Sequence, residues 1–194
     1  MQALYQLTDA ELISSYQTGN SDAIELLINR YKDKVFTGIF MLVKDRFLAE
    51  DLFQEAFLKM IRTIKSGSYS EQGKFLPWAM RVAHNLCMDH FRKVRHDVPI
   101  ILPDGRDLSE ILPLTTGDAS EAMERRQTHE SVRQMIERLP DEQREVIILR
   151  MYGDQSFKEI ADLTGVSINT ALGRMRYALI NLRKMITDNQ LVLR

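Results

Sequence analysis

An all-α fold is predicted from three features of the 194-residue sequence. Apolar residues recur at three- and four-residue steps, few stretches alternate strictly between apolar and polar residues, and only five Pro and nine Gly interrupt the chain. We expect two small helical domains, an N-terminal helix bundle over residues 1–96 and a C-terminal helix-turn-helix domain over residues 122–194. A flexible acidic linker over residues 97–121 is expected to join them.

The N-terminal bundle is expected to begin with a short helix that has signals at both ends. Thr8 and Glu11 form a capping box, and Gly19 can stop the helix. A second helix is expected from Asp22 to the region of Lys44. Its apolar residues follow three- and four-residue steps: Ile24, Leu27, Ile28, Tyr31, Val35, Ile39 and Leu42.

Two further helices complete the expected bundle. The third, over about 48–64, carries a buried ridge at four-residue spacing formed by Leu52, Ala56, Met60 and Ile64 and widened by Phe53 and Phe57. After a polar loop over 66–73, Pro77 suits the first turn of a fourth helix that reaches about Arg95.

The expected linker differs in composition from the rest of the chain. It holds three Pro, two Gly and six acids against one Arg, a local charge of −5. Repeated Pro and like charge disfavour a helix and favour an extended tether. Its apolar residues leave open a second interpretation, in which the segment docks partly onto a domain: Ile100, Ile101, Leu102, Ile111, Leu112 and Leu114.

A helix-turn-helix is predicted between Lys158 and Arg176. Ser156 begins a second capping box, Gly165 ends the first helix in a left-handed conformation, and Ser167 caps the second helix. The second helix is predicted to bury Leu172, Met175 and Leu179 and to leave Arg174, Arg176, Tyr177 and Arg183 more outward.

Positive charge gathers around that second helix. From residue 167 to the C-terminus five Lys or Arg oppose one acid, in a chain whose net charge is −1. This excess suits a surface that faces phosphates, and the motif predicts that the helix enters a DNA groove. An ordinary solvated basic face is the alternative interpretation.

A polar face is expected on the third helix, where Asp51, Gln54, Glu55 and Lys59 lie within reach of one another at three- and four-residue spacing. Such a stripe suits a partner helix of complementary charge, and a solvated face is again the alternative. Paired carboxylates also act as acid and base in enzymes, but no nucleophile, His or metal-ligand set lies near in the sequence. We therefore expect no enzymatic activity and no cofactor.

Basic and aromatic residues combine on the fourth helix and the loop before it: Lys74, Phe75, Trp78, Arg81, Phe91, Arg92, Lys93 and Arg95. Cations hold phosphates and rings accept unstacked bases, so the set suits single-stranded nucleic acid, although the aromatic residues also suit core packing. Asn85 can read a base edge, because its amide both donates and accepts hydrogen bonds. His84, Cys87 and His90 spread over roughly 9 Å of helix and are not expected to share a metal ion.

The cellular compartment is predicted from what the sequence lacks. The single Cys87 cannot form an intramolecular disulfide, which fits a reducing cytoplasm. No signal peptide and no apolar run of membrane-spanning length is present in the sequence, so we expect a cytoplasmic protein without membrane insertion.

Three motifs in a fixed order resemble those of a known family. They are Asp51-Leu-Phe-Gln-Glu-Ala-Phe-Leu-Lys-Met, Trp78-Ala-Met-Arg-Val-Ala-His-Asn85-Leu-Cys-Met-Asp89 and Leu139-Pro-Asp-Glu-Gln-Arg-Glu-Val, followed by the helix-turn-helix. Together they resemble bacterial σ70-family sigma factors of the extracytoplasmic function group over nearly the whole chain. That family binds RNA polymerase core and directs it to promoters. The resemblance therefore implies promoter recognition, strand opening and transcription initiation.

The resemblance also assigns roles to three surfaces. The polar face Asp51, Gln54, Glu55 and Lys59 would grip the clamp helices of the β′ subunit. Asn85 would help to capture a flipped base of the −10 element, and the loop over 66–75 would form the base pocket. The surface that binds the −10 element would consist of Lys74, Phe75, Trp78, Arg81, Asn85, Arg92 and Lys93. The −35 element would lie against Ser167, Asn169, Thr170, Leu172, Gly173, Arg174, Arg176 and Tyr177.

Leu172 departs from the family pattern. Many relatives have Thr-Val-Lys-Ser-Arg where this chain has Thr170-Ala-Leu172-Gly173-Arg174. Leucine can contact a thymine methyl group but cannot hydrogen-bond to guanine, so we predict an altered −35 preference. In the alternative interpretation Leu172 packs inward and phosphate contacts supply the affinity.

The implied partners are the polymerase core, including its β subunit, and promoter DNA. Members of the group are commonly held inactive by an anti-sigma factor, although no residue here identifies one. Two rival functions stay open: a stand-alone helix-turn-helix regulator, and an interaction protein that occupies polymerase without reading promoters.

Overall fold

The computed structural model describes residues 6–70, 73–96 and 131–188. Every regular element within these ranges is a helix, which confirms the predicted all-α fold. The acidic segment expected over 97–121 lies outside the described residues. None of the described helices is both long and apolar enough to cross a membrane.

Four described helices form the N-terminal bundle: α2 (Asp9–Gln17), α3 (Ser21–Val43), α4 (Arg46–Lys65) and α5 (Phe75–His96). The capping box of Thr8 and Glu11 at the start of α2 is confirmed, because each side chain bonds the backbone N–H of the other. Asp45 caps α4 by accepting from the N–H of Leu48 at 2.9 Å. Just before that cap, Lys44 adopts the left-handed conformation with φ 57°, which ends α3 and starts the turn into α4.

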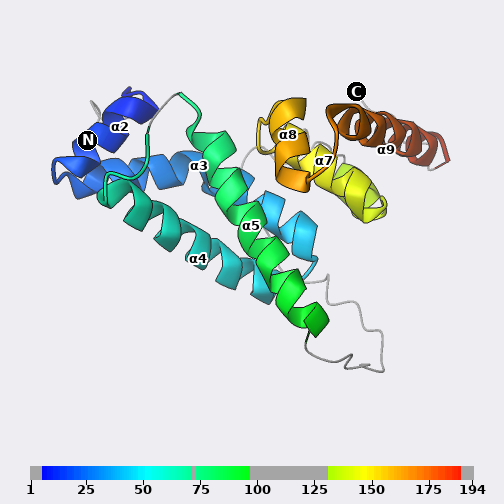
Figure 1. Cartoon of the computed structure of the whole chain (residues 1–194), viewed down its shortest axis with the longest axis horizontal. Helices are drawn as coiled ribbons and strands as arrows, with labels where there is room; N and C mark the ends of the chain where they lie inside the picture. Colours follow the sequence, from blue (N-terminus) through cyan, green and yellow to red (C-terminus); the bar gives the residue numbers. More distant parts are fainter. Residues whose placement is uncertain (1–5, 71–72, 97–130, 189–194) are drawn as a thin grey trace, which may run out of the picture.

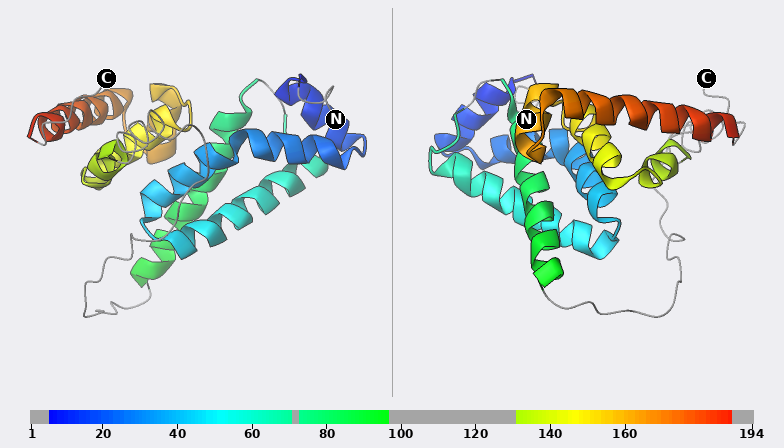
Figure 2. Two further views of the ribbon diagram at one scale, coloured as in Figure 1. Left: turned by 180° about the vertical axis from the view of Figure 1, so that it is seen from behind. Right: turned by 45° about the vertical axis from the view of Figure 1, so that its right-hand side comes forward.

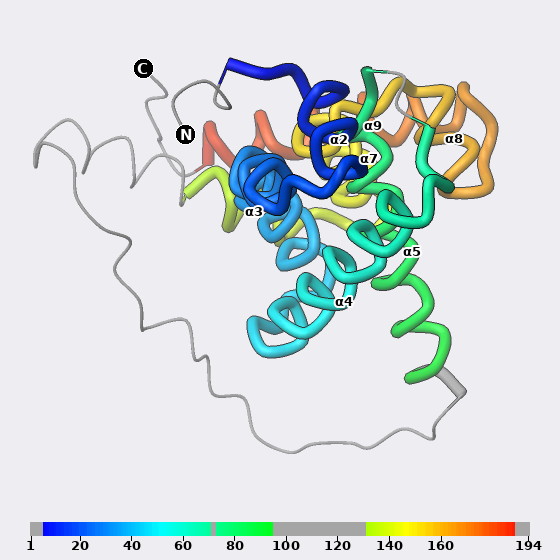
Figure 3. Tube along the Cα trace, turned by 90° about the vertical axis from the view of Figure 1, so that its left-hand side faces the viewer, coloured from blue at the N-terminus to red at the C-terminus, as the bar shows by residue number. Residues whose placement is uncertain are grey.

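The core of the bundle lies between α3, α4 and α5, which pack against one another in pairs (Figure 3). The ridge predicted on α4 is confirmed, because Leu52, Ala56, Met60 and Ile64 are all buried. Burying each of the larger side chains contributes about 1.5–3 kcal/mol, so this ridge is a main source of bundle stability.

The remaining described helices form a C-terminal unit. Residues 131–137 are helical, and they are followed by α7 (Asp141–Met151), α8 (Phe157–Thr164) and α9 (Ile168–Asp188). Helix α9 packs on α7 and α8, and Figure 2 shows it on the side of the unit that is turned away from the bundle.

The C-terminal unit packs against the bundle through α7, which contacts α3 (Figure 1). One continuous apolar cluster contains most of the bundle core together with residues of the C-terminal unit, namely Ile136, Leu139, Ile147, Ile148 and Ala178. The two units therefore meet through a shared apolar contact.

Candidate nucleic-acid and partner-binding surfaces

The helix-turn-helix has the helix ends that its sequence predicts. Ser156 and Glu159 form the capping box of α8, and Gly165 ends that helix with φ 68°. Ser167 then caps α9 by accepting from the N–H of Thr170 at 3.1 Å. Hydrogen bonds from the side chain and backbone of Ser156 lower the pKa of Glu159 to about 2, so its carboxylate is charged at neutral pH.

The buried side of α9 differs from the predicted stripe. Leu172 is 44% exposed and Leu179 is 41% exposed, so only Met175 of the predicted stripe turns inward. Small residues take the contact positions, because Ala171 and Ala178 are fully buried against the neighbouring helices. Alanine lets two helix backbones approach closely, and this close packing leaves the larger leucines outside. The inward packing considered for Leu172 is therefore also wrong.

The outer face of α9 presents most of the residues expected to meet the −35 element. Exposed side chains come from Ser167, Asn169, Thr170, Leu172, Arg176 and Tyr177, while Gly173 and Arg174 are half-buried. Neither Arg174 nor Arg176 forms an ion pair with another described residue. Their charges are therefore available to phosphates.

A polar and basic face runs along α5. Arg81, Asn85 and Arg92 are exposed and lie on one side of the helix, one turn and two turns apart, and Lys93 is exposed beside them. Arg92 pairs with Asp89 at 3.1 Å on the same helix surface. This face combines an amide that can read a base with cations that can hold the backbone.

A cluster of aromatic rings fixes the start of α5. The Tyr69 ring lies 4.3 Å from that of Trp78 and 6.2 Å from that of Phe75, between ring centroids. Phe75 is only 2% exposed, so its ring lies in the bundle core and supports the surface from below. Trp78 is half-buried. Lys74, just before α5, forms an ion pair with Glu159 of α8 at 3.1 Å.

The polar stripe of α4 faces solvent. Asp51, Gln54, Glu55 and Lys59 are all exposed, on the side away from the buried ridge. No ion pair joins these three charged groups to another described residue. Two carboxylates, an amide and an ammonium group are thus presented together for a partner.

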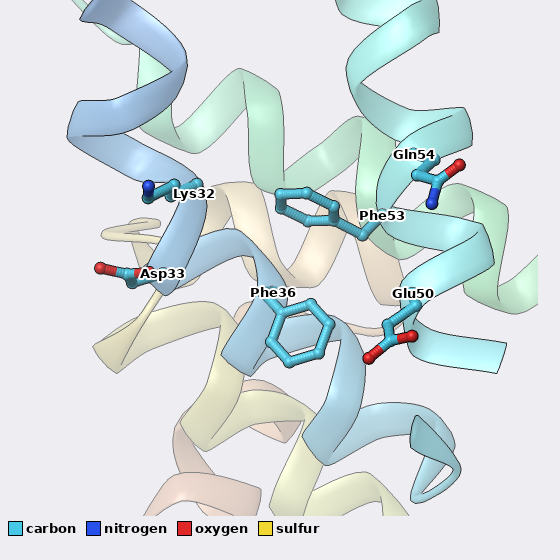
Figure 4. Close-up of a pocket in the computed structure, with 6 residues that line it drawn as sticks. All are labelled: Lys32, Asp33, Phe36, Glu50, Phe53 and Gln54. Carbon is cyan, nitrogen blue, oxygen red and sulfur yellow. The ribbon is translucent and has the colours of Figure 1, made fainter. Parts of the chain in front are cut away.

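An open pocket of about 340 Å³ adjoins this stripe, between α3 and α4 (Figure 4). The rings of Phe36 and Phe53 form its apolar floor and meet edge to face with centroids 5.6 Å apart. Polar side chains stand around them: Lys32, Asp33, Glu50 and Gln54. Gln54 belongs to both the pocket and the stripe, so the two features form one surface.

His84 and Cys87 of α5 are both buried. His84 is buried and its Nε2 lies 2.7 Å from a carboxylate oxygen of Glu145 in α7. Cys87 is fully buried, and burial raises the pKa of its thiol to about 12. Within the described ranges, no group of three or more His, Cys, Asp or Glu is placed to hold a metal ion.

Several residues of these surfaces were not identified from the sequence. Tyr69 is the lone aromatic residue in a polar loop, a signal that would have identified it as an anchor. Phe53 was interpreted only as part of the apolar ridge, and Phe36 was not singled out. Nothing in the local sequence shows that the two rings meet across α3 and α4. The pair of Lys74 with Glu159 joins residues 85 positions apart, and no local pattern predicts it.

Comparisons with known proteins cover both units. Residues 27–96 match the family model for Sigma-70 region 2, and residues 129–177 match that for Sigma-70, region 4. The chain is 31% identical over 177 residues to RNA polymerase sigma factor CarQ of Myxococcus xanthus, a match that covers 91% of this chain and 96% of that protein. It is 27% identical over 180 residues to ECF RNA polymerase sigma factor SigW of Bacillus subtilis, covering 91% of this chain and 95% of that protein.

Two solved structures share the fold. The sigma factor RpoE of Bartonella quintana, solved with the anti-sigma factor NepR, matches with a TM-score of 0.62 at 19% identity, over 84% of this chain and 96% of that chain. CnrH, solved with the cytosolic domain of CnrY, matches with a TM-score of 0.59 at 18% identity, over 93% and 97% of the two chains. The helical arrangement described above is thus also found in solved proteins of distant sequence.

Proposed function

The chain belongs to the σ70 family of RNA polymerase sigma factors, in its extracytoplasmic function group, and from this premise we propose which residues carry each step. As a sigma factor it binds RNA polymerase core and directs promoter recognition and transcription initiation. Sigma factors are regulators, and we propose that this chain has no enzymatic activity of its own. We place it in the cytoplasm, where it meets the polymerase.

The polar stripe of α4 is the proposed contact with core polymerase. Asp51, Gln54, Glu55 and Lys59 would face the clamp helices of the β′ subunit, and the exposure of all four side chains supports this role. Because none of the charged groups is paired within the described residues, a partner of complementary charge meets no competing ion pair. The adjoining aromatic pocket offers room for an apolar side chain of the same partner.

The −10 element is proposed to bind along α5. Asn85 would read an unstacked base of the separated strand, while Arg81, Arg92 and Lys93 hold the backbone and the half-buried Trp78 stacks on a base. Lys74 would join them at the start of the helix. Phe75 would act indirectly, by holding the loop before α5 in place from within the core.

The −35 element is proposed to bind the outer face of α9. The N-terminal residues of the helix would reach base edges, and Arg174 and Arg176 would contact phosphates. The exposure of Leu172 supports a contact with a thymine methyl group. We further propose contacts with the β subunit and regulation by an anti-sigma factor. RpoE of Bartonella quintana was solved with the anti-sigma factor NepR, and CnrH was solved with the cytosolic domain of CnrY.

Reconstituted transcription tests this function. The purified chain is added to sigma-free core polymerase with a promoter library, and promoter-selective transcripts are sequenced. The double variant Asp51→Arg, Glu55→Arg is expected to lose core binding and transcription. The double variant Glu25→Arg, Glu142→Arg changes the net charge equally at exposed positions elsewhere and is expected to keep both. Duplex DNA binding without any core association would instead establish a stand-alone regulator.

A further inference from the structure

One aromatic side chain anchors the loop between α4 and α5. Tyr69 is 9% exposed, whereas residues 66–68 and 70 of the same loop are exposed. Gly67 and Gly73 lie on either side of it with φ 72° and 71°, so the chain turns before and after the tyrosine. Within the described part of the loop, this ring is therefore the one side chain buried against the bundle.

The ring of Tyr69 belongs to a chain of aromatic contacts that begins on α3. The Tyr31 and Phe75 rings lie 5.3 Å apart between centroids, and Phe75 lies 6.2 Å from Tyr69. Tyr69 in turn lies 4.3 Å from Trp78, and Phe75 contacts the same indole at 5.7 Å. The far end of the chain is tied to α2, because the Tyr31 hydroxyl donates to Asp9 at 2.5 Å. Neighbouring rings therefore set the position of Trp78.

Trp78 lies on the side of α5 that is proposed to bind the −10 element. Arg81 and Asn85 follow it by three and seven residues, which places all three on one face of the helix. Seven residues of helix span about 10 Å, roughly three times the spacing of about 3.4 Å between neighbouring bases of a strand. Trp78 and Asn85 would therefore contact different nucleotides, with the indole holding a second base while the amide reads the first.

The orientation of the indole decides whether it can stack, because a base and an aromatic ring must meet nearly face to face. The Tyr69 and Trp78 planes are inclined by 45°, and those of Phe75 and Trp78 by 55°. Two tilted neighbours in close packing restrict the rotation of the ring between them. We propose that Tyr69 is a positioning residue for base capture, which holds Trp78 at its stacking angle and ties it to the loop. This inference rests on the function proposed above.

The test removes the ring of Tyr69 and leaves the rest of the chain unaltered. Tyr69→Leu replaces the ring by an aliphatic side chain, and Tyr69→Phe keeps the ring. Tyr16→Leu is the matched control, because Tyr16 is a half-buried tyrosine of α2 outside the proposed DNA surfaces. Holoenzyme made with each chain is titrated with a single-stranded nontemplate −10 oligonucleotide. Chemical denaturation measures the stability of each free chain.

Tyr69→Leu is expected to weaken oligonucleotide binding about two- to twelvefold, the range that an aromatic pair contributes. Tyr69→Phe and Tyr16→Leu are expected to bind as the unaltered chain does. Trp78 is the single tryptophan of the sequence, so the emission anisotropy of the free chain reports the freedom of its ring. That anisotropy is expected to fall in Tyr69→Leu and to keep its value in Tyr69→Phe.

Oligonucleotides with one abasic site each separate positioning from folding. At the nucleotide that stacks on Trp78, the missing base is expected to remove the difference between Tyr69→Leu and the unaltered chain, because both changes remove the same contact. A difference that persists with an abasic site at every position, or equal binding by Tyr69→Leu and the unaltered chain, would overturn the proposal. A failure of the sigma assignment would be seen separately, because no holoenzyme would form. The same titrations on the chain alone would then decide the role of Tyr69.

Discussion

A contact between Leu172 and a thymine methyl group predicts a measurable effect of a single methyl. Leu172 keeps 44% of its surface exposed in the free chain. Burying a whole leucine contributes about 1.5–3 kcal/mol, so covering the exposed part in the DNA groove contributes roughly 0.7–1.3 kcal/mol. That range corresponds to about three- to ninefold in affinity. The methyl group alone contributes about 0.8 kcal/mol, or about fourfold.

The assay replaces each thymine of the −35 element in turn by uracil, which removes the methyl group and leaves the hydrogen-bonding edges unchanged. Binding of the polymerase holoenzyme is measured for the unaltered chain and for Leu172→Ala. At one position uracil is expected to weaken binding by the unaltered chain about fourfold. At that position uracil is expected not to weaken binding by Leu172→Ala any further, because the two changes remove the same contact.

Leu179→Ala provides the control, since Leu179 is a leucine of similar exposure two turns further along α9. It is expected to show the same uracil effect as the unaltered chain. Equal sensitivity of the unaltered chain and Leu172→Ala to uracil at every position would refute the methyl contact. The phosphate contacts would then account for binding on this face.

Three further predictions concern stability and reactivity. Gly165→Ala is expected to destabilise the C-terminal unit by about 1–2 kcal/mol in chemical denaturation, because φ is 68° there and alanine rarely adopts the left-handed conformation. A steric clash adds nothing to this cost, since no atom lies near enough to meet a Cβ. Gly165→Asn should cost less than Gly165→Ala, and equal losses for the two variants would contradict this reason. Glu159 has a pKa lowered from 4.5 to about 2, so its stabilising contribution is present above about pH 4.5 and is lost as the pH falls towards 2. The stability difference between the unaltered chain and Glu159→Gln should shrink over that window, whereas a constant difference would show that its hydrogen bonds do not depend on charge. Cys87 has a thiol pKa raised to about 12 and should resist alkylation at about pH 8 until the chain unfolds; rapid alkylation of the native chain would contradict its burial.

Local sequence signals predicted the helix ends well. Ser156 with Glu159, and Ser167 before α9, act through neighbours three residues away, so the chain segment itself contains the whole interaction. The ridge of α4 was equally predictable, because four large or medium apolar residues repeat at one spacing. In both cases the information lies within a few turns of helix.

Contacts between distant segments were not predictable in the same way. On α9 the prediction chose the leucines as the buried stripe, but Ala171 and Ala178 make the close contacts because they allow backbones to approach. Met80 lies on α5 among apolar residues of ordinary spacing, and nothing nearby shows that its side chain enters the core of another unit. The predicted roles of Asp51, Asn85 and Arg176 in binding stay predictions.

On α9 the residues that anchor the helix are separate from the residues proposed to contact the promoter, and this separation affects how promoter preference can change over evolution. The residues that anchor the helix, Ala171 and Ala178, are fully buried, whereas Asn169, Leu172 and Arg176 face outward. A substitution on the outer face therefore leaves the anchoring contacts intact and carries little penalty for folding. With the −35 contacts proposed for this face, substitutions made one residue at a time would change the −35 preference while each intermediate still folds.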